Sequence, residues 1–271
     1  MPFTPIFWKK NLNYKRLPED YYTTSTCDEC DETVHEEQRY CHNCGNYLGA
    51  EAVTINIFNN SDLRRVFIFY FIYLFICLLI KHSSWFNTYD ELFWVELILA
   101  VITLRFTWLN WSQVKPILRF NNFNWQVLLG VTLIAVVGSL LVTISVRELN
   151  VTFFHTEFSY YEAYKLYNYR TLVMIYSIAL MPALFEELAF RGIMFNYCSN
   201  FLDERLVVAL TAFLFSIMHL NLMSLVWLIP FAFFMGNLRR KYNTIWYGIV
   251  FHFVFNLTAC LFDLYREGEL F

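Results

Sequence analysis

Seven long apolar runs constrain this chain more than any other feature of its sequence. They cover residues 66–80, 92–111, 125–146, 171–185, 206–220, 225–238 and 244–261. A membrane helix needs about 20 mainly apolar residues, and aromatic residues flanking the shorter runs suit the membrane interface. The chain is 58% hydrophobic, whereas soluble domains are about 45–50% apolar. We therefore expect an all-α fold, a polytopic membrane helix bundle of about seven spans in a lipid bilayer.

The distribution of basic residues predicts the orientation of this bundle. With seven spans and a cytoplasmic N-terminus, 13 Lys and Arg residues fall on the inner side and 5 on the outer side. Cytoplasmic segments of membrane proteins are enriched in these residues. We therefore expect an integral membrane protein, in the cell membrane if the host is bacterial, with its N-terminus in the cytoplasm. The small net charge of −3 argues against a nucleic-acid partner.

Four cysteines near the N-terminus form two pairs with metal-ligand spacing. Cys27 and Cys30 make the first Cys-x-x-Cys pair, and Cys41 and Cys44 make the second. Two such pairs can close a tetrahedral zinc site, and Gly45 suits the positive φ of the turn that follows. Disulfides are the alternative, but a reducing cytoplasm disfavours them. We therefore predict a small zinc ribbon that holds a structural zinc and whose partner is unknown.

Ionisable residues directly follow the fourth apolar run, within the predicted span, where they are costly and call for a reason. Glu187 and Arg191 are four residues apart, so they lie on one face of a helix and can pair. Glu186 is turned about 100° away and lacks that partner. Such a carboxylate is suited to general acid–base work, although both glutamates can also simply mark the end of a span. Pro182 is expected to kink this helix.

Three further polar residues lie in later apolar runs. His219 ends one run, and His252 and Asn256 lie one turn apart on the last. Each can be a packed, hydrogen-bonded residue, since polar pairs commonly join membrane helices. With a rise of about 1.5 Å per residue, however, all of them fall at a depth similar to that of Glu186. This common depth favours a single buried site.

The motifs Glu186-Glu187-x-x-x-Arg191, Phe215-x-x-x-His219 and His252-x-x-x-Asn256 resemble those of the CPBP family. This family includes CAAX prenyl endopeptidases and the bacterial bacteriocin-processing and immunity (Abi) proteins. The resemblance covers residues 171–262 as a motif core. It implies a transmembrane protease domain over residues 56–271, after a zinc-ribbon and linker region over residues 1–55.

The resemblance also implies a role for each polar residue. Glu186 and His219 would activate a water molecule, and His252 and Asn256 would form the oxyanion hole. Glu187 and Arg191 would orient the site. The residue types suit this chemistry, since a carboxylate and an imidazole can share the proton of water while N–H groups stabilise an oxyanion.

We therefore expect an intramembrane endopeptidase that cleaves membrane-associated peptide or protein tails. If bacterial, its role would be peptide or bacteriocin processing, or self-immunity. No cofactor is expected for catalysis because the His-Glu-x-x-His zinc motif is absent, although two histidines and two glutamates leave a metal mechanism as an alternative. Another alternative is a non-catalytic membrane binding or immunity protein that uses the polar cluster for docking. A third makes the ribbon the main functional element and the spans its anchor.

Overall fold

The computed structural model describes residues 24–35, 40–48, 57–86, 88–120, 123–156 and 159–269. The chain divides into two compact units, Met1–Ile55 and Asn56–Phe271, and each is described by itself. Several basic residues used in the orientation argument lie outside the described residues, namely Lys9, Lys10, Lys15, Arg16 and Arg39.

The first unit holds one small antiparallel sheet. Strand β1 (Thr24–Thr26) pairs with β2 (Thr33–His35). Tyr40 and Tyr47 form an isolated antiparallel bridge beyond it. Cys27 and Cys30 lie between the two strands, and Cys41 and Cys44 lie between the two bridge residues, so each backbone pairing closes one Cys-x-x-Cys turn.

The second unit is a helix bundle, and all seven apolar runs fall on helices. The first four correspond to α1 (Ser61–His82), α2 (Tyr89–Leu109), α4 (Trp125–Leu149) and the continuous series α6 (Arg170–Ile175), η4 (Tyr176–Leu180) and α7 (Met181–Glu187). The series continues through η5 (Leu188–Met194) and α8 (Phe195–Ser199). The last three runs correspond to α9 (Glu204–Met218), α10 (Leu225–Tyr242) and α11 (Trp246–Arg266).

Shorter elements connect the long helices. They are α3 (Trp111–Val114) and the 3-10 helix η2 (Lys115–Leu118) after α2, and η3 (Asn150–Phe154) and α5 (Tyr160–Tyr164) after α4. Within the described part of the chain, five helices are long and apolar enough to cross a membrane. Two of the seven predicted spans are outside this set, because α9 has only 15 residues and α10 ends in Arg239, Arg240 and Lys241. The predicted all-helical membrane fold is confirmed.

Local sequence signals explain where several helices begin. The side chain of Asn60 accepts hydrogen bonds from the backbone N–H groups of Asp62 and Leu63 and caps α1. Asn124 and Asp203 cap α4 and α9 in the same way. Such caps satisfy N–H groups that have no partner inside the helix. A hydrogen bond of 2.7 Å from Asn200 to Asp62 then ties the segment before α9 to the start of α1.

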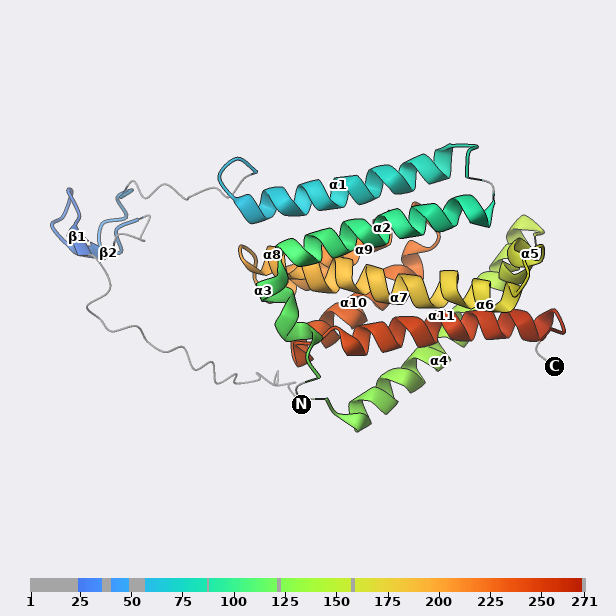
Figure 1. The fold of residues 1–271 in the computed structure, drawn as a ribbon. Coiled ribbons are helices and arrows are strands. Elements are labelled where there is room, and N and C mark those ends of the chain that lie inside the picture. The colour runs from blue at the N-terminus through green and yellow to red at the C-terminus, as the bar shows by residue number, and fades with distance from the viewer. Residues whose placement is uncertain are drawn as a thin grey trace, which may run out of the picture. The chain divides into compact units, whose positions relative to one another are not determined.

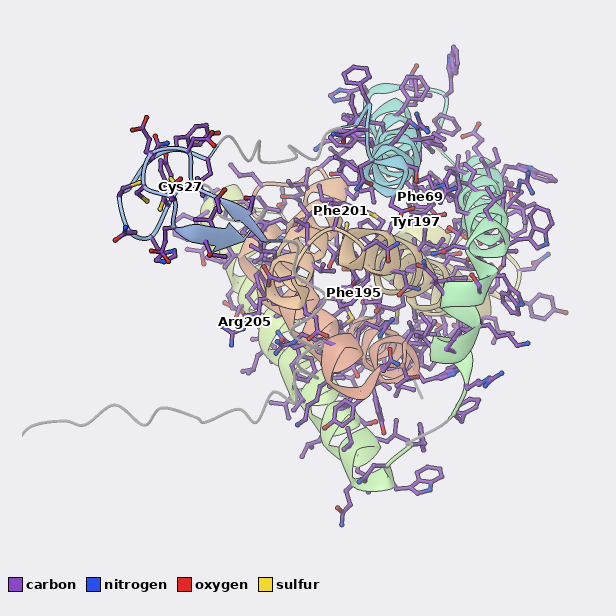
Figure 2. All side chains as sticks on the ribbon, turned by 90° about the vertical axis from the view of Figure 1, so that its left-hand side faces the viewer. Cys27, Phe69, Phe195, Tyr197, Phe201 and Arg205 are labelled. Atoms are coloured by element: carbon purple, nitrogen blue, oxygen red, sulfur yellow. The ribbon has the colours of Figure 1, made fainter. Side chains whose placement is uncertain are left out.

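The series from α6 to α8 lies at the centre of the bundle. Its side chains Ala189, Ile193 and Met194 are completely buried. Helix α11 packs along it and against α4, while α10 packs against α9 and α1 contacts α8 and α2 (Figure 1). Figure 2 shows Tyr197 of α8 near Phe69 of α1 at one of these contacts.

The outer faces of the long helices are apolar. On α1, Phe67, Phe71 and Phe75 are 43%, 53% and 62% exposed. An exposed apolar face of this extent is unusual on a soluble monomer. It is suited to contact with lipid, so the hydrophobic surface and the buried polar residues together describe a membrane bundle with a polar interior.

Candidate active site

The two glutamates lie at the end of α7, between two π-helical segments. Segment η4 ends just before α7, and η5 begins just after Glu187. A π-helical turn holds an extra residue and shifts the faces of the helix that follows, and such turns are frequent at functional sites. Pro182 lies in the first turn of α7. The glutamates are therefore carried by a helix whose register changes on both sides of them.

Glu187 and Arg191 form a fully buried ion pair. Nη1 of Arg191 lies 2.8 Å from Oε1 of Glu187, and the side chains are 1% and 0% exposed. Arg191 also donates to the backbone carbonyl of Ala232 at 3.1 Å and lies 4.6 Å from the centre of the Phe215 ring. Burying two charges is tolerated only with good geometry and further hydrogen bonds. The i,i+4 pairing expected from the sequence is present.

His252 contacts the same carboxylate from α11. Its Nδ1 lies 3.3 Å from Oε1 of Glu187, and its side chain is buried. A carboxylate oxygen only accepts hydrogen bonds, so Nδ1 carries the hydrogen. Nε2 then bears a lone pair when the ring is neutral and a hydrogen when it is an imidazolium. Glu187 thus fixes both the orientation and the tautomer of His252.

Gly248 allows Glu187 to occupy this position, and sequence reasoning missed it. A Cβ atom at residue 248 would lie 2.6 Å from Oε2 of Glu187, closer than real contacts allow. Gly248 lies four residues before His252, so both are on one face of α11. That spacing is the signal in the sequence: a glycine one turn before the histidine leaves room for the partner of that histidine.

Glu186 lines a cavity together with the other polar residues. His219, His252 and Asn256 line the same cavity of about 470 Å³. Oε2 of Glu186 is buried and has no hydrogen-bond partner among the described residues. A second cavity of about 260 Å³ is also lined by Glu186 and His219. The structure therefore brings four of the six predicted residues to one cavity, and places Glu187 and Arg191 in a buried pair next to it.

His219 lies at the point where α9 ends. Its Nδ1 is 3.1 Å from the backbone carbonyl oxygen of Phe215, one turn earlier. A carbonyl oxygen only accepts, so Nδ1 donates and Nε2 of the neutral ring is left as an acceptor. The next residue, Leu220, has a φ of 51° and turns the chain out of the helix. A basic nitrogen is thereby held at the lining of the cavity.

Asn256 is held by the central helix. Its Nδ2 donates to the backbone carbonyl of Ile178 at 2.8 Å. The amide nitrogen carries two hydrogens, so this bond leaves one of them for another acceptor. An amide fixed in this way can present an N–H group to a ligand in the cavity that Asn256 lines.

The four N-terminal cysteines form a separate candidate metal site. Their sulfur atoms all lie within 4.8 Å of one another. The pairs Cys27–Cys44 and Cys30–Cys41 are 3.6 and 3.5 Å apart, close to the roughly 3.8 Å edge expected for sulfurs around tetrahedral zinc. These distances are far longer than a disulfide bond of about 2.05 Å, and all four cysteines are free. Figure 2 shows Cys27 within this group of sulfurs.

The backbone around these cysteines suits a metal knuckle. The N–H of Gly45 donates to the carbonyl of Cys41 at 2.9 Å, and Gly45 has the positive φ of 75° expected for it. The backbone N–H of Cys44 lowers the pKa of Cys41 to about 6, which favours the thiolate. The N–H of Asn46 acts to lower the pKa of Cys44, but burial and the neighbouring sulfurs raise it to about 12. The cluster can hold a metal ion, and binding would displace the remaining protons.

Comparison with known proteins identifies the family that the site resembles. Residues 168–258 match the family model described as Rce1-like, Type II CAAX prenyl endopeptidase Rce1-like. This segment, which is less than half of the chain, holds all six predicted site residues. No curated protein and no solved structure matches the chain. The resemblance found in the three motifs is thus confirmed over this segment, and with the five apolar helices it supports an integral membrane protein.

Proposed function

We propose that this protein is an intramembrane endopeptidase in which Glu186 and His219 activate a water molecule. The observation that carries the proposal is the shared cavity, which Glu186, His219, His252 and Asn256 line from three different helices or helix ends. The match of residues 168–258 to a CAAX endopeptidase family supports peptidase chemistry.

In this proposal the water gives one proton to the Glu186 carboxylate as its oxygen attacks the peptide carbonyl, while His219 accepts a hydrogen bond from the same water. Oε2 of Glu186 has no partner among the described residues, and Nε2 of neutral His219 is an acceptor, so both can receive a proton. The same proton then passes to the departing amine, and the peptide C–N bond breaks. A carboxylate with an imidazole is sufficient for this step, so the proposed mechanism uses no metal.

The oxyanion that forms during attack needs N–H donors. Asn256 offers its second amide hydrogen. His252 offers Nε2–H only as an imidazolium, since its Nδ1 already donates to Glu187. Removing one oxyanion donor typically costs about 100- to 1000-fold in rate, so Asn256 and His252 are proposed to carry most of the transition-state stabilisation.

The proposed substrate is a membrane-associated peptide or protein tail, because the cavity lies in a bundle whose outer surface is apolar. A bacterial role in peptide or bacteriocin processing, or in self-immunity, follows from the resemblance to the CPBP family. The bound metal of the ribbon is proposed to be a structural zinc, and the ribbon is proposed to face the cytoplasm. The described residues of the ribbon do not indicate which partner it binds.

The experiment compares the membrane peptidome of cells that make the wild-type protein, Glu186→Gln or Glu148→Gln. The first substitution removes the proposed base with little change in shape, and the second is a control on the exposed end of α4. We expect cleavage fragments with the wild type and the control and their loss with Glu186→Gln. Unchanged fragments with Glu186→Gln would favour the alternative of a docking protein that needs no general base.

A further inference from the structure

The hydrogen bond that holds Asn256 is accepted at a place where a proline interrupts the α-helical bonding of the central helix. In a regular α-helix the carbonyl of residue 178 would accept a hydrogen bond from the N–H of residue 182. Residue 182 is proline, which has no N–H to donate. The carbonyl of Ile178 instead accepts a hydrogen bond of 2.8 Å from Nδ2 of Asn256.

We infer that Pro182 is a positioning residue that leaves the Ile178 carbonyl to hold the Asn256 amide at the catalytic cavity. The inference rests on the proposed function, because it assigns to Pro182 a part in arranging the oxyanion hole. Pro182 itself lines the cavity, but its effect on the reaction is exerted through Asn256.

The same bond decides which way the amide points. A carbonyl oxygen repels the Oδ1 of an asparagine and attracts its Nδ2, so the Ile178 carbonyl selects one of the two amide orientations. Without this acceptor, Asn256 can rotate by 180° and present Oδ1 where the oxyanion forms. An oxygen at that place destabilises the developing negative charge, so the orientation matters as much as the position.

Segment η4 strengthens the connection between Pro182 and Asn256. It ends at Leu180, two residues before Pro182, and contains Ile178. Helix α11 packs directly against η4 and α7. The local departure from α-helical bonding therefore faces the helix that carries Asn256, so a change in the bonding of Ile178 acts on α11 without passing through another element.

The test is a double-mutant cycle with Pro182→Ala, Asn256→Ala and the double variant. Alanine restores an N–H that can bond to the Ile178 carbonyl and compete with Asn256. Because a misplacement of about 1 Å can cost about 100-fold in rate, we expect Pro182→Ala to lower kcat by about 10- to 100-fold. KM should change little, because the oxyanion contact forms only in the transition state. In the Asn256→Ala background the same substitution should cost less than about 2-fold, because the interaction it disturbs is already absent.

Two additions separate positioning from general damage to the helix. Pro230→Ala changes the proline inside α10, which is exposed and lines neither of the two cavities that contain Glu186; it should leave kcat unchanged. Pro182→Gly also restores the N–H, so it should lower kcat as Pro182→Ala does. It takes the place of the alanine variant if that variant does not fold. In protein labelled with ¹⁵N-asparagine, the Asn256 side-chain amide, identified by its loss in Asn256→Ala, should shift in both Pro182 variants.

The possible outcomes separate this inference from the proposed function. If Asn256→Ala keeps full peptidase activity, the oxyanion role and the proposed mechanism fail first. If Asn256→Ala is impaired but Pro182→Ala is not, or if Pro182→Ala costs the same in both backgrounds, the positioning role of Pro182 is wrong while the peptidase proposal stands. An unchanged amide resonance in the Pro182 variants would also overturn it.

Discussion

Glu186 and Glu187 are neighbours in the chain but have different surroundings. The carboxylate of Glu187 contacts Arg191 and His252 and is completely buried. That of Glu186 lines the cavity, which the Glu187 side chain does not. Each carboxylate has one oxygen without a hydrogen-bond partner among the described residues. The 100° step between successive helical residues is sufficient to separate these two environments. One glutamate is therefore available for proton transfer while the other organises the histidine beside it.

The contact between Gly248 and Glu187 gives a prediction at this scale. Gly248→Ala places a methyl group 2.6 Å from the position of Oε2 of Glu187, so the carboxylate must move. Because His252 is oriented by that carboxylate, we expect peptidase activity to fall about 10- to 100-fold. Cleavage of a peptide by purified protein in proteoliposomes measures the change. Gly130→Ala is the control, since nothing lies within 4 Å of its added atom; equal activity of the two variants would contradict the account.

At the scale of elements, the sequence predicts the existence of the helices better than their internal geometry. All seven apolar runs are helical, because burial of apolar residues in lipid favours helices of that length. The segments η4 and η5 were not predicted, since a change from i+4 to i+5 bonding depends on packing against neighbouring helices. Pro182 indicated a disturbance of the helix. The sequence did not indicate that the Asn256 side chain donates a hydrogen bond to the carbonyl of Ile178.

The four-cysteine cluster of the first unit gives a prediction at this scale, because the proposed zinc ribbon would depend on its metal for stability. Its sheet has only two strands of 3 residues each, and its core is formed largely by the cysteines themselves. We expect one zinc per chain in purified protein, measured by inductively coupled plasma mass spectrometry. Cys41→Ser should lose most of this metal, whereas Cys198→Ser, a buried cysteine of α8, should retain it. Zinc content that is the same in both variants would contradict a Cys₄ site.

At the scale of the whole molecule, the chain combines a small unit whose four cysteines could hold a metal ion with a membrane bundle that contains the candidate site. Each of the six polar residues could be identified from the sequence because ionisable and amide groups are costly in apolar runs. Their convergence could be inferred only from depth, and the contacts that organise them could not. Gly248 and the carbonyls of Ile178 and Phe215 have no polar side chain to mark them, so they became visible only with the fold.

The separation into two units predicts that peptidase activity does not need the ribbon. All groups that line the cavity lie within residues 142–266, in the second unit. We therefore expect a chain without residues 1–55 to cleave a peptide at a rate within about 3-fold of the full chain. Loss of cleavage by a truncated protein that melts at the same temperature would instead make the ribbon a functional part of the enzyme.

The claim that water activated by Glu186 cuts the peptide bond is tested most directly by isotope transfer. A single turnover of purified protein in H₂¹⁸O should place one ¹⁸O atom in the new C-terminal carboxylate of the product, detected by mass spectrometry. Glu186→Gln should form no labelled product in the same time. Labelled product from Glu186→Gln at the wild-type rate, or product from the wild type without ¹⁸O, would contradict the account.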